Sequence, residues 1–319
     1  MSIRLLRPGL FTLVVDGGRP RTRGLGVPVG GPADAPAMAV ANRLVGNPPA
    51  AAALEITLVG PKLVCTHPVG LALFGAPFTV KRDGEEITAG SSFTLRPGQT
   101  LDIGGVRAAH EYSRAYLAVV GGFQTPEVLG SRTGFAPLAA DAELPCVEST
   151  VRGRTLPNSM YAGLTLCLLG YKLESGALRC LLGPQADWFD DTFWGRQVYQ
   201  VAPASDRMGV RLTIFEGLGV PLQRPPRELV SEAVAPGAVQ ITNDGLPIVL
   251  GVDGQTIGGY PKIAHVLTDE LPTLGQLRPG HPVMFRRVTE EEAEDLAKKY
   301  AERRKALDEY LDRAIPRPV

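Results

Sequence analysis

Short β-prone runs, separated at regular intervals by turn residues, constrain the fold of this chain more than any other feature of its sequence. Between positions 53 and 120 such runs cover 54–59, 63–65, 70–74, 78–81, 93–95, 100–103 and 113–120. Gly-Pro, Arg-Asp-Gly and Pro-Gly turns separate these runs, and their spacing is typical of a β-sandwich or β-barrel. The 37 glycines and 28 prolines supply the turns that such a fold requires. We therefore expect a mainly β protein with few helices.

The remaining elements are expected on both sides of this region. Further strands are predicted at 2–15, 164–169, 177–182, 198–201 and 265–267. A helix is predicted at 34–46, because Asp34 can cap it and Pro36 suits its first turn. A short helix is expected between Trp188 and Trp194.

A capping box opens a charged C-terminal helix. The box is Thr289-Glu-Glu-Glu292, and the helix is expected to continue to about Ala314. Its apolar positions form one stripe that we expect to pack on a barrel, namely Ala293, Leu296, Tyr300, Leu307, Tyr310 and Leu311. We accordingly divide the chain into a region of two β-rich subdomains at 1–288 and a helix at 289–319.

Charge and composition exclude several classes of function. Lys+Arg and Asp+Glu both total 33, so no net field attracts nucleic acid or an acidic membrane. No apolar run is long enough to cross a bilayer and the start of the chain does not resemble a signal peptide, so a cytoplasmic protein is expected. The four cysteines (65, 146, 167 and 180) form no Cys-x-x-Cys pair and are expected to be buried free thiols. The four histidines are isolated, and no metal site is expected.

The stretch 237–262 is the strongest candidate for a binding site. Two β-prone runs flank Asn243-Asp244-Gly245, which predicts a hairpin because these residues tolerate positive φ angles. The second run leads into polar residues interleaved with glycines: Asp253, Gln255, Thr256, Tyr260 and Lys262. Glycines allow a close approach of the backbone to a ligand. An irregular turn with a packed tyrosine explains the same residues equally well.

Two other segments carry charged residues at strand ends. In the glycine-rich loop that begins at Asp16, we expect Asp16 and Arg19 to be site residues and the arginines at 21 and 23 to be solvated. Farther along, 205–212 brings Asp206, Arg207 and Arg211 together, either as a structural ion pair or with the two arginines facing a substrate carboxylate. Backbone N–H groups of 130–134 are a further candidate for binding an anion. No dinucleotide fingerprint, Walker loop or nucleophile elbow is present. The residues alone therefore indicate polar recognition of a small amide or carboxylate.

Four blocks of sequence resemble the allophanate-hydrolase-subunit-2 family, which includes the C subunit of 5-oxoprolinase and the carboxyltransferase A/B subdomains of urea carboxylase. The first block combines Val15-Asp-Gly-Gly-Arg-Pro, Gly26-Val-Pro-Val-Gly-Gly-Pro-Ala-Asp34 and Ala41-Asn-Arg-Leu-Val-Gly-Asn47. The second is Ala53-Leu-Glu-Ile-Thr with Gly60-Pro61, and the third is Tyr116-Leu-Ala-Val-Val-Gly-Gly122 with Gly130-Ser-Arg132. The fourth joins Ser205-Asp-Arg-Met-Gly-Val-Arg-Leu212, the 237–262 stretch and Gln276-Leu-Arg-Pro-Gly280. Together they span about residues 5–288.

The resemblance implies a fold and a function. The family is similar in fold to cyclophilin-like β-barrels in two subdomains. The resemblance implies that this chain is a subunit of an ATP-dependent 5-oxoprolinase, which opens 5-oxoproline to glutamate. The implied partners are a subunit-1-type protein (the kinase-inhibitor-like B subunit of 5-oxoprolinase) and the lactam-utilising A subunit. Two alternatives stay open: a biotin-dependent carboxyltransferase component of the urea-carboxylase type, or a non-catalytic regulatory partner of the subunit-1-type protein. No Met-Lys-Met site for covalent biotin is present, and which subunit binds the nucleotide ATP is left open.

The chain departs from the family pattern at two places. Val15 stands where the family usually has Gln, and Thr133-Gly-Phe-Ala-Pro-Leu-Ala-Ala140 replaces a double-glycine segment. The second departure leaves the substrate, and the site at Arg132, open.

Within this framework we assign roles to the polar residues. Asp16 is the expected base or orienting acid, and Lys262 the expected stabiliser of developing negative charge. The expected substrate-binding residues are Arg19, Asn42, Arg207, Arg211, Gln240, Asp253, Gln255, Thr256 and Tyr260. We expect the Asp16 corner and the Lys262 corner to line one cleft between two barrels.

Overall fold

The computed structural model describes residues 1–88, 90–107, 112–156, 177–195 and 197–314. The chain divides into two compact units, each with its own hydrophobic core. The first comprises Met1–Arg19, Gly30–Thr165 and Lys305–Val319; the second comprises Pro20–Val29 and Leu166–Arg304.

The first unit contains eleven of the described strands and one complete helix. They are β1 (Ser2–Arg7), β2 (Phe11–Val15), α1 (Ala35–Val45), β3 (Ala53–Thr57), β4 (Lys62–Cys65), β5 (Val69–Gly75), β6 (Phe78–Arg82), β7 (Glu85–Glu86), β8 (Ser92–Leu95), β9 (Thr100–Val106), β10 (Arg114–Val119) and β11 (Glu143–Pro145).

The second unit contains the later strands and most of the short helices. They are η1 (Arg23–Leu25), β12 (Ala177–Leu182), η4 (Ala186–Trp188), η5 (Asp191–Phe193), β13 (Tyr199–Val201), β14 (Gly209–Ile214), β15 (Glu232–Ala233), β16 (Ala238–Ile241), β17 (Pro247–Leu250), β18 (Ile257–Gly258), β19 (Lys262–Val266), η6 (Thr268–Glu270), α3 (Leu271–Gln276) and β20 (Pro282–Arg287). The last helix, α4 (Glu290–Ala314), is shared between the two units.

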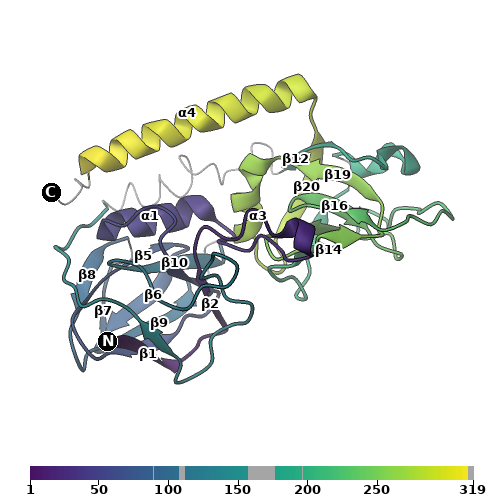
Figure 1. Ribbon diagram of the computed structural model, residues 1–319. Coiled ribbons are helices and arrows are strands. Elements are labelled where there is room, and N and C mark those ends of the chain that lie inside the picture. Colours follow the sequence, from purple (N-terminus) through teal and green to yellow (C-terminus); the bar gives the residue numbers. More distant parts are fainter. Residues whose placement is uncertain (89, 108–111, 157–176, 196, 315–319) are drawn as a thin grey trace. The chain divides into compact units, whose positions relative to one another are not determined.

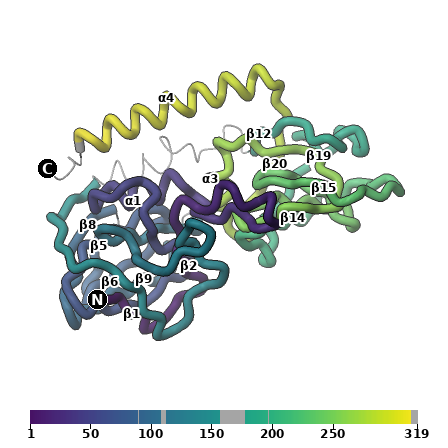
Figure 2. Tube along the Cα trace, viewed as in Figure 1, coloured from purple at the N-terminus to yellow at the C-terminus, as the bar shows by residue number. Residues whose placement is uncertain are grey.

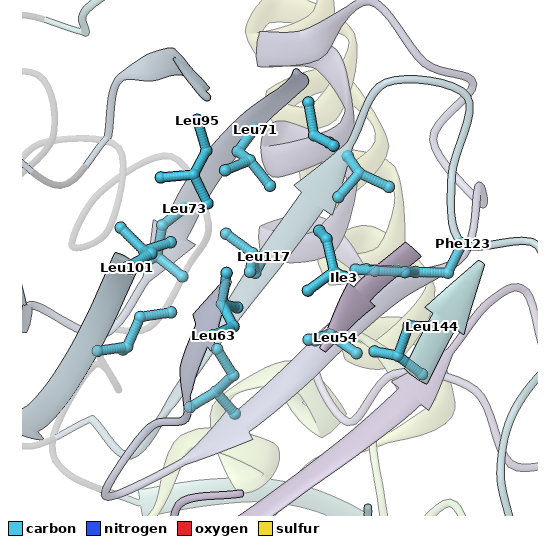
Figure 3. Packing of buried hydrophobic residues seen from close by; sticks show 14 of the residues in the cluster. Ile3, Leu54, Leu63, Leu71, Leu73, Leu95, Leu101, Leu117, Phe123 and Leu144 are labelled. Carbon is cyan, nitrogen blue, oxygen red and sulfur yellow. The ribbon is translucent and has the colours of Figure 1, made fainter. Parts of the chain in front are cut away.

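Two antiparallel sheets enclose the core of the first unit. Their strand orders are β11-β1-β4-β9-β6-β7 and β2-β3-β10-β5-β8. Side chains of both sheets converge on the space between them, as Ile3 and Leu63 of one sheet and Leu54 and Leu117 of the other show in Figure 3. The whole of β5 is buried, because α1 covers the other face of its sheet (Figure 1). Asp34 caps α1 as predicted, since its Oδ1 accepts a hydrogen bond of 2.9 Å from the Ala37 N–H.

A closed seven-stranded barrel forms the second unit, with the strand order β12-β19-β16-β17-β14-β13-β20. Figure 2 follows several of these strands, in green, along the Cα trace. Side chains alternate along each strand, so Val210, Leu212, Val239 and Val249 fill the interior. The interior also contains the stacked rings of Phe193 and Phe285, 4.6 Å apart between centroids. The interior is therefore a packed core.

The predicted mainly β fold with a barrel is confirmed, and the structure differs from the expectations only in local detail. Residues 2–15 form two strands instead of one, because the chain turns at Gly9. Gly9 has a φ of +78°, and a Cβ there would lie 2.4 Å from the Val59 carbonyl oxygen. The short helix expected between Trp188 and Trp194 forms as the 3-10 helix η5, a second 3-10 helix, η4, ends at Trp188, and α3 was not predicted. The strand expected at 164–169 lies outside the described residues.

The C-terminal helix α4 begins where the capping box predicted. The Thr289 Oγ1 accepts a hydrogen bond of 3.1 Å from the Glu292 N–H. The predicted apolar stripe is the less exposed face, and Leu307 and Leu311 on it are buried. Within the first unit, Asp312 of α4 forms an ion pair with Arg43 of α1. The helix is thus held by packing as well as by charge.

Two further expectations concern cysteines and membranes. Cys65, Cys146 and Cys180 are free and buried, as expected, and Cys167 lies outside the described residues. None of the helices within the described ranges combines the length and the apolar character that a membrane span needs.

Candidate functional site

Asp16 lies at the end of β2, where hydrogen-bond donors surround its carboxylate. Its Oδ1 accepts from the Gly18 N–H at 2.9 Å and from the hydroxyls of Ser131 (2.5 Å) and Thr133 (2.9 Å). Its Oδ2 accepts from the Arg132 N–H at 2.6 Å. Burial raises the pKa of Asp16, but these hydrogen bonds outweigh burial and hold the pKa below its ordinary value. A carboxylate so engaged is a poor proton acceptor, and the geometry favours the orienting role over the role of a base.

The anion predicted to bind the backbone of 130–134 is thus part of the same chain. The Arg132 N–H points at the carboxylate of Asp16, a residue more than a hundred positions away. The Arg132 guanidinium does not face this carboxylate; it bonds to the Thr125 carbonyl and pairs with Glu127 at 3.2 Å.

Arg19 is buried and also joins loop to loop. Its guanidinium donates to the carbonyl oxygens of Val128 (2.9 Å) and Thr133 and lies 4.2 Å from the centroid of the Phe135 ring. These described contacts are with carbonyls and a ring of its own unit. Arg19 therefore supports the loop that holds Asp16.

The unusual segment 133–140 runs along the edge strand β2. The Gly134 N–H donates to the Val14 carbonyl at 2.9 Å and the Leu138 N–H to the Thr12 carbonyl at 2.8 Å. A sheet edge has unpaired backbone groups, and this segment satisfies them. The segment therefore covers that edge.

In the second unit a row of side chains crosses the outer face of the barrel. Arg211 of β14 pairs in register with Ile248 of β17, Ile248 with Gln240 of β16, and Gln240 with Lys262 of β19. These residues alternate with the interior side chains, so they face outward. Adjacent strands lie about 4.8 Å apart, which puts Arg211 and Gln240 about 10 Å apart across the sheet. That separation suits a small ligand with a polar group at each end.

A pocket of about 180 Å³ lies on this row. It brings together four of the predicted site residues, with Asp206 as an addition, and its lining comprises Asp206, Met208, Gly209, Arg211, Gln240, Thr242, Ile248, Leu250, Gln255 and Tyr260. A second pocket of about 440 Å³ adjoins it and shares Arg211, Thr242, Ile248 and Tyr260 with it. The hairpin at Asn243-Asp244-Gly245 forms as predicted and lines the second pocket.

Arg211 places a free cation in the pocket. Its backbone is fixed, because the Ser205 hydroxyl accepts from the Arg211 N–H at 3.0 Å and donates to the Arg211 carbonyl at 3.1 Å. Its guanidinium is exposed and forms no hydrogen bond or ion pair with any residue that the structure describes. Arg211 is thus an arginine available for an anionic ligand.

Gln240 and Gln255 add two amides to the pocket. The Gln255 Nε2 donates to the Gln240 Oε1 and the Gln240 Nε2 to the Tyr260 carbonyl, each at 3.4 Å, which is long for a hydrogen bond. Gly258 makes room for them, since a Cβ there would lie 2.7 Å from the Gln255 Nε2 and 2.8 Å from the Gln240 Nε2. The weakly held amides can exchange these contacts for a ligand carbonyl or N–H.

A structural ion pair was one of two expectations for 205–212, and Arg207 does form one, but with Asp253, which was predicted to bind substrate. The guanidinium is buried and bidentate, with Nε at 2.7 Å from Oδ2 and Nη2 at 3.0 Å from Oδ1. Its partner is Asp253 and not the neighbouring Asp206. The pair holds the turn before β14 against the turn after β17, and neither residue lines the two pockets.

Lys262 is buried at the end of the row, outside both pockets. Its Nζ pairs with Glu232 of β15, and the Lys262 hydrogen bond lowers the pKa of that carboxyl. Gln185 joins the two, because its Oε1 accepts from the Lys262 N–H at 2.9 Å and its Nε2 donates to Glu232 at 2.9 Å. Lys262, the expected stabiliser of negative charge, is therefore already paired with the Glu232 carboxylate in this structure.

Two predicted binding residues have roles within the fold. Asn42 is fully buried in α1, where its Nδ2 donates to the carbonyls of Pro49 (3.1 Å) and Ala51 (2.9 Å) and its Oδ1 accepts from Asn47 at 3.0 Å. Thr256 contributes its carbonyl to the Val234 N–H at 3.1 Å and lines neither pocket.

Asp16 and Lys262 belong to different units, and their common cleft stays a prediction. Sequence reasoning missed Gln185 and Glu232, considered Ser131 and Thr133 only through their backbone N–H groups, and considered Asp206 only as an ion-pair partner. Only the Gly130-Ser-Arg132 block signalled Ser131. Within the described parts of the chain, no group of three or more His, Cys, Asp or Glu residues is arranged to hold a metal ion.

Comparison with known proteins gives consistent results. Residues 25–287 match the family described as carboxyltransferase domain, subdomain A and B. The C subunit of 5-oxoprolinase from Escherichia coli is 35% identical over 302 residues, which cover 91% of this chain and 93% of that protein.

Solved structures extend the comparison. The Kluyveromyces lactis urea amidolyase matches with a TM-score of 0.80 and 27% identity, over 98% of this chain and 20% of its own. TTHA0988 matches with a TM-score of 0.74 and 35% identity, over 90% of this chain and 55% of its own. The chain thus spans about half of one of these proteins and a fifth of the other. The resemblance found in the four sequence blocks is confirmed, and the chain belongs to the family of carboxyltransferase domains with subdomains A and B.

Proposed function

We propose that this chain is the C subunit of a 5-oxoprolinase, in which it helps to hydrolyse 5-oxoproline to glutamate. The observation that carries the proposal is the extent of the match to the C subunit of the E. coli 5-oxoprolinase, which covers 93% of that protein. Only 20% of the urea amidolyase chain, by contrast, is matched. The match therefore corresponds to nearly the whole of a separate subunit.

The pocket on the second unit supports this proposal chemically. 5-Oxoproline is a small ring with one carboxylate and one amide. The pocket offers one free guanidinium, Arg211, and the amides of Gln240 and Gln255. Guanidinium groups bind carboxylates through paired charge-assisted hydrogen bonds, and amide side chains match both the C=O and the N–H of a lactam.

ATP is consumed by the complex in this proposal, and we assign its binding to a partner subunit. The two pockets described above are lined by Asp206 and Asp244 beside the single cation Arg211. Carboxylates repel a triphosphate, so these pockets fit a singly charged ligand better. The partners proposed are the subunit-1-type protein, which is the B subunit of such a complex, and the lactam-utilising A subunit.

The proposal is tested by reconstitution. Co-expression with both partners should give ATP hydrolysis that depends on 5-oxoproline and releases glutamate, and omission of this chain should abolish it. Full turnover without this chain would overturn the proposal.

A biotin-dependent carboxyltransferase is the second candidate, favoured by the family match and by the fold shared with urea amidolyase. It predicts transfer of a labelled carboxyl group from a separate carboxybiotin carrier to urea. Label in the urea product, with no turnover of 5-oxoproline, would replace the first candidate by this one.

A further inference from the structure

We propose that Arg211 and Asp206 together recognise the two substituents of an amino-acid α-carbon, the carboxylate and the nitrogen, and so set the specificity of the pocket. This inference rests on the proposed function and assigns atoms of the substrate to residues of this chain. Asp206 was expected only as an ion-pair partner, and the structure gives it a different position.

Only one of the two oxygens of the Asp206 carboxylate accepts hydrogen bonds from the described residues. Its Oδ1 accepts hydrogen bonds from the N–H groups of Met208 (2.8 Å) and Gly209 (3.1 Å), which closes the turn before β14. Its Oδ2 has no partner among the residues that the structure describes, and the side chain is exposed where it lines the pocket. The arginine next to it in sequence, Arg207, is bound to Asp253 and does not neutralise it. One carboxylate oxygen is thus fixed in position and available.

Arg211 supplies the opposite charge two residues beyond this turn. Gly209 and Arg211 lie on the same face of β14, because side chains alternate along a strand. Both charged residues line one cavity of about 180 Å³, and both have their backbones anchored: the Asp206 N–H donates to the Gly209 carbonyl at 3.2 Å and the Arg211 N–H to the Ser205 hydroxyl at 3.0 Å. A fixed cation and a fixed anion in one small pocket complement a ligand that carries a carboxylate and an N–H group on the same carbon.

The other polar groups then meet the amide carbonyl. Gln240 lies two strands from Arg211, about 10 Å across the sheet. With the carboxylate at Arg211 and the ring N–H at Asp206, the lactam C=O is directed toward Gln240 and Gln255. Ile248, between Arg211 and Gln240 in the row, offers an apolar surface for the ring carbons.

The contact with Asp206 should be stronger for the product, glutamate, than for 5-oxoproline. Hydrolysis breaks the ring C–N bond: water adds its hydroxyl to the carbonyl carbon and its proton to the nitrogen. The new carboxylic acid then transfers its proton to the amine, so the products are a second carboxylate and an ammonium group. Asp206 then faces a positive charge in place of a neutral N–H. Hydrogen bonds between two charged groups are stronger than those with one, so Asp206 should matter more for glutamate than for 5-oxoproline.

Calorimetry on the full chain, alone and in complex with its partners, tests this assignment. Arg211→Ala should weaken the binding of both 5-oxoproline and glutamate roughly tenfold. It should also remove the preference for 5-oxoproline over pyrrolidin-2-one, the same ring without the carboxylate. Asp206→Asn should weaken glutamate binding roughly tenfold and 5-oxoproline binding by less than about threefold. The Asn side chain retains the carbonyl oxygen that accepts from Met208 and Gly209, so the turn is preserved.

Two matched variants serve as controls. Arg287→Ala removes an exposed strand arginine of the same barrel, and Asp187→Asn removes an exposed aspartate of the same unit, neither of which lines the pocket. Both should bind as the wild type does. Equal affinity of Arg211→Ala and wild type for 5-oxoproline, or equal losses for both ligands in Asp206→Asn, would overturn the inference.

The result is separable from the proposed function. Absence of 5-oxoproline-dependent ATP hydrolysis in the wild-type complex would refute the function, whereas the binding measurements need no turnover. Failure of the wild-type chain to bind either ligand, alone or in complex, would refute the inference.

Discussion

Three of the four hydrogen bonds to the Asp16 carboxylate come from residues 131–133, so this side chain fixes a distant loop. Asn has the same shape, but it replaces one accepting oxygen by an amide NH2 group. That NH2 group would face one of the hydrogen-bond donors that now bind the carboxylate. Asp16→Asn should therefore cost about 1–2 kcal/mol, near the low end for bonds to a charged group because Asp16 is half-buried.

Local hydrogen exchange measures this effect directly. The Gly18 and Arg132 amides should exchange faster in Asp16→Asn, whereas the Leu10 amide, bonded to the Val59 carbonyl at 2.8 Å, should not change. Unchanged protection at Arg132 would contradict the orienting role.

The same carboxylate makes this loop sensitive to acid. The pKa of Asp16 is lower in the folded protein than the ordinary value of 3.8. Its stabilising contribution is therefore complete above the unfolded pKa and is lost as the pH falls through the folded pKa. The loop should open below about pH 4 in the wild type. Asp16→Asn lacks the titrating carboxyl, so exchange of the Arg132 amide in this variant should follow only the pH dependence of intrinsic exchange.

Among the elements, the β16–β17 hairpin depends on a glycine at its turn. Gly245 has a φ of +77°, and a Cβ there would lie 2.3 Å from the Leu222 carbonyl oxygen. Gly245→Ala combines backbone strain with a clash against the neighbouring chain segment and should destabilise by about 2–4 kcal/mol.

Gly280→Ala isolates the first of these two effects. Gly280 has a φ of +84°, and no described atom lies within 4 Å of the position that a Cβ would take, so this change should cost only about 1–2 kcal/mol. Thermal melting of both variants compares them. Equal melting temperatures would show that the contact with Leu222 is unimportant.

Elements with local signals were predictable, and contacts between distant segments were not. Asp34 and Pro36 indicate α1, and Asn243-Asp244-Gly245 indicates a hairpin, because capping and turn chemistry act within a few residues. Pro8-Gly9 carried the signal for a break that the prediction of one strand overlooked. The choice of Asp253 over Asp206 as partner of Arg207 is made by the fold, which brings two turns together across 46 positions.

For the candidate site, too, residues within one stretch were predictable and their partners from distant segments were not. Arg211, Gln240, Gln255 and Tyr260 were predicted and line one pocket. Lys262 was predicted from the same stretch, but it is engaged by Glu232, a residue that no motif or spacing pointed to. Strand pairing decides which polar residues share a face, and the register of four strands was not readable from the chain alone.

At the scale of the whole molecule, two separate hydrophobic cores predict two local responses to core mutation. Leu117 is fully buried in the first unit, and Leu117→Ala should destabilise that unit by about 2–5 kcal/mol. Hydrogen exchange should accelerate in the amides of β3, β5 and β10 and remain slow in those of β16 and β19, whose side chains pack in the other core. Equal acceleration in both sets would show that the units unfold as one.

The alternation of side chains on the barrel has an evolutionary consequence. Interior positions of β14, β16 and β17 hold the barrel together, while Arg211 and Gln240, which line the pocket, lie outside that core. Selection can therefore exchange an Arg211 or a Gln240 for another polar residue and leave the scaffold intact.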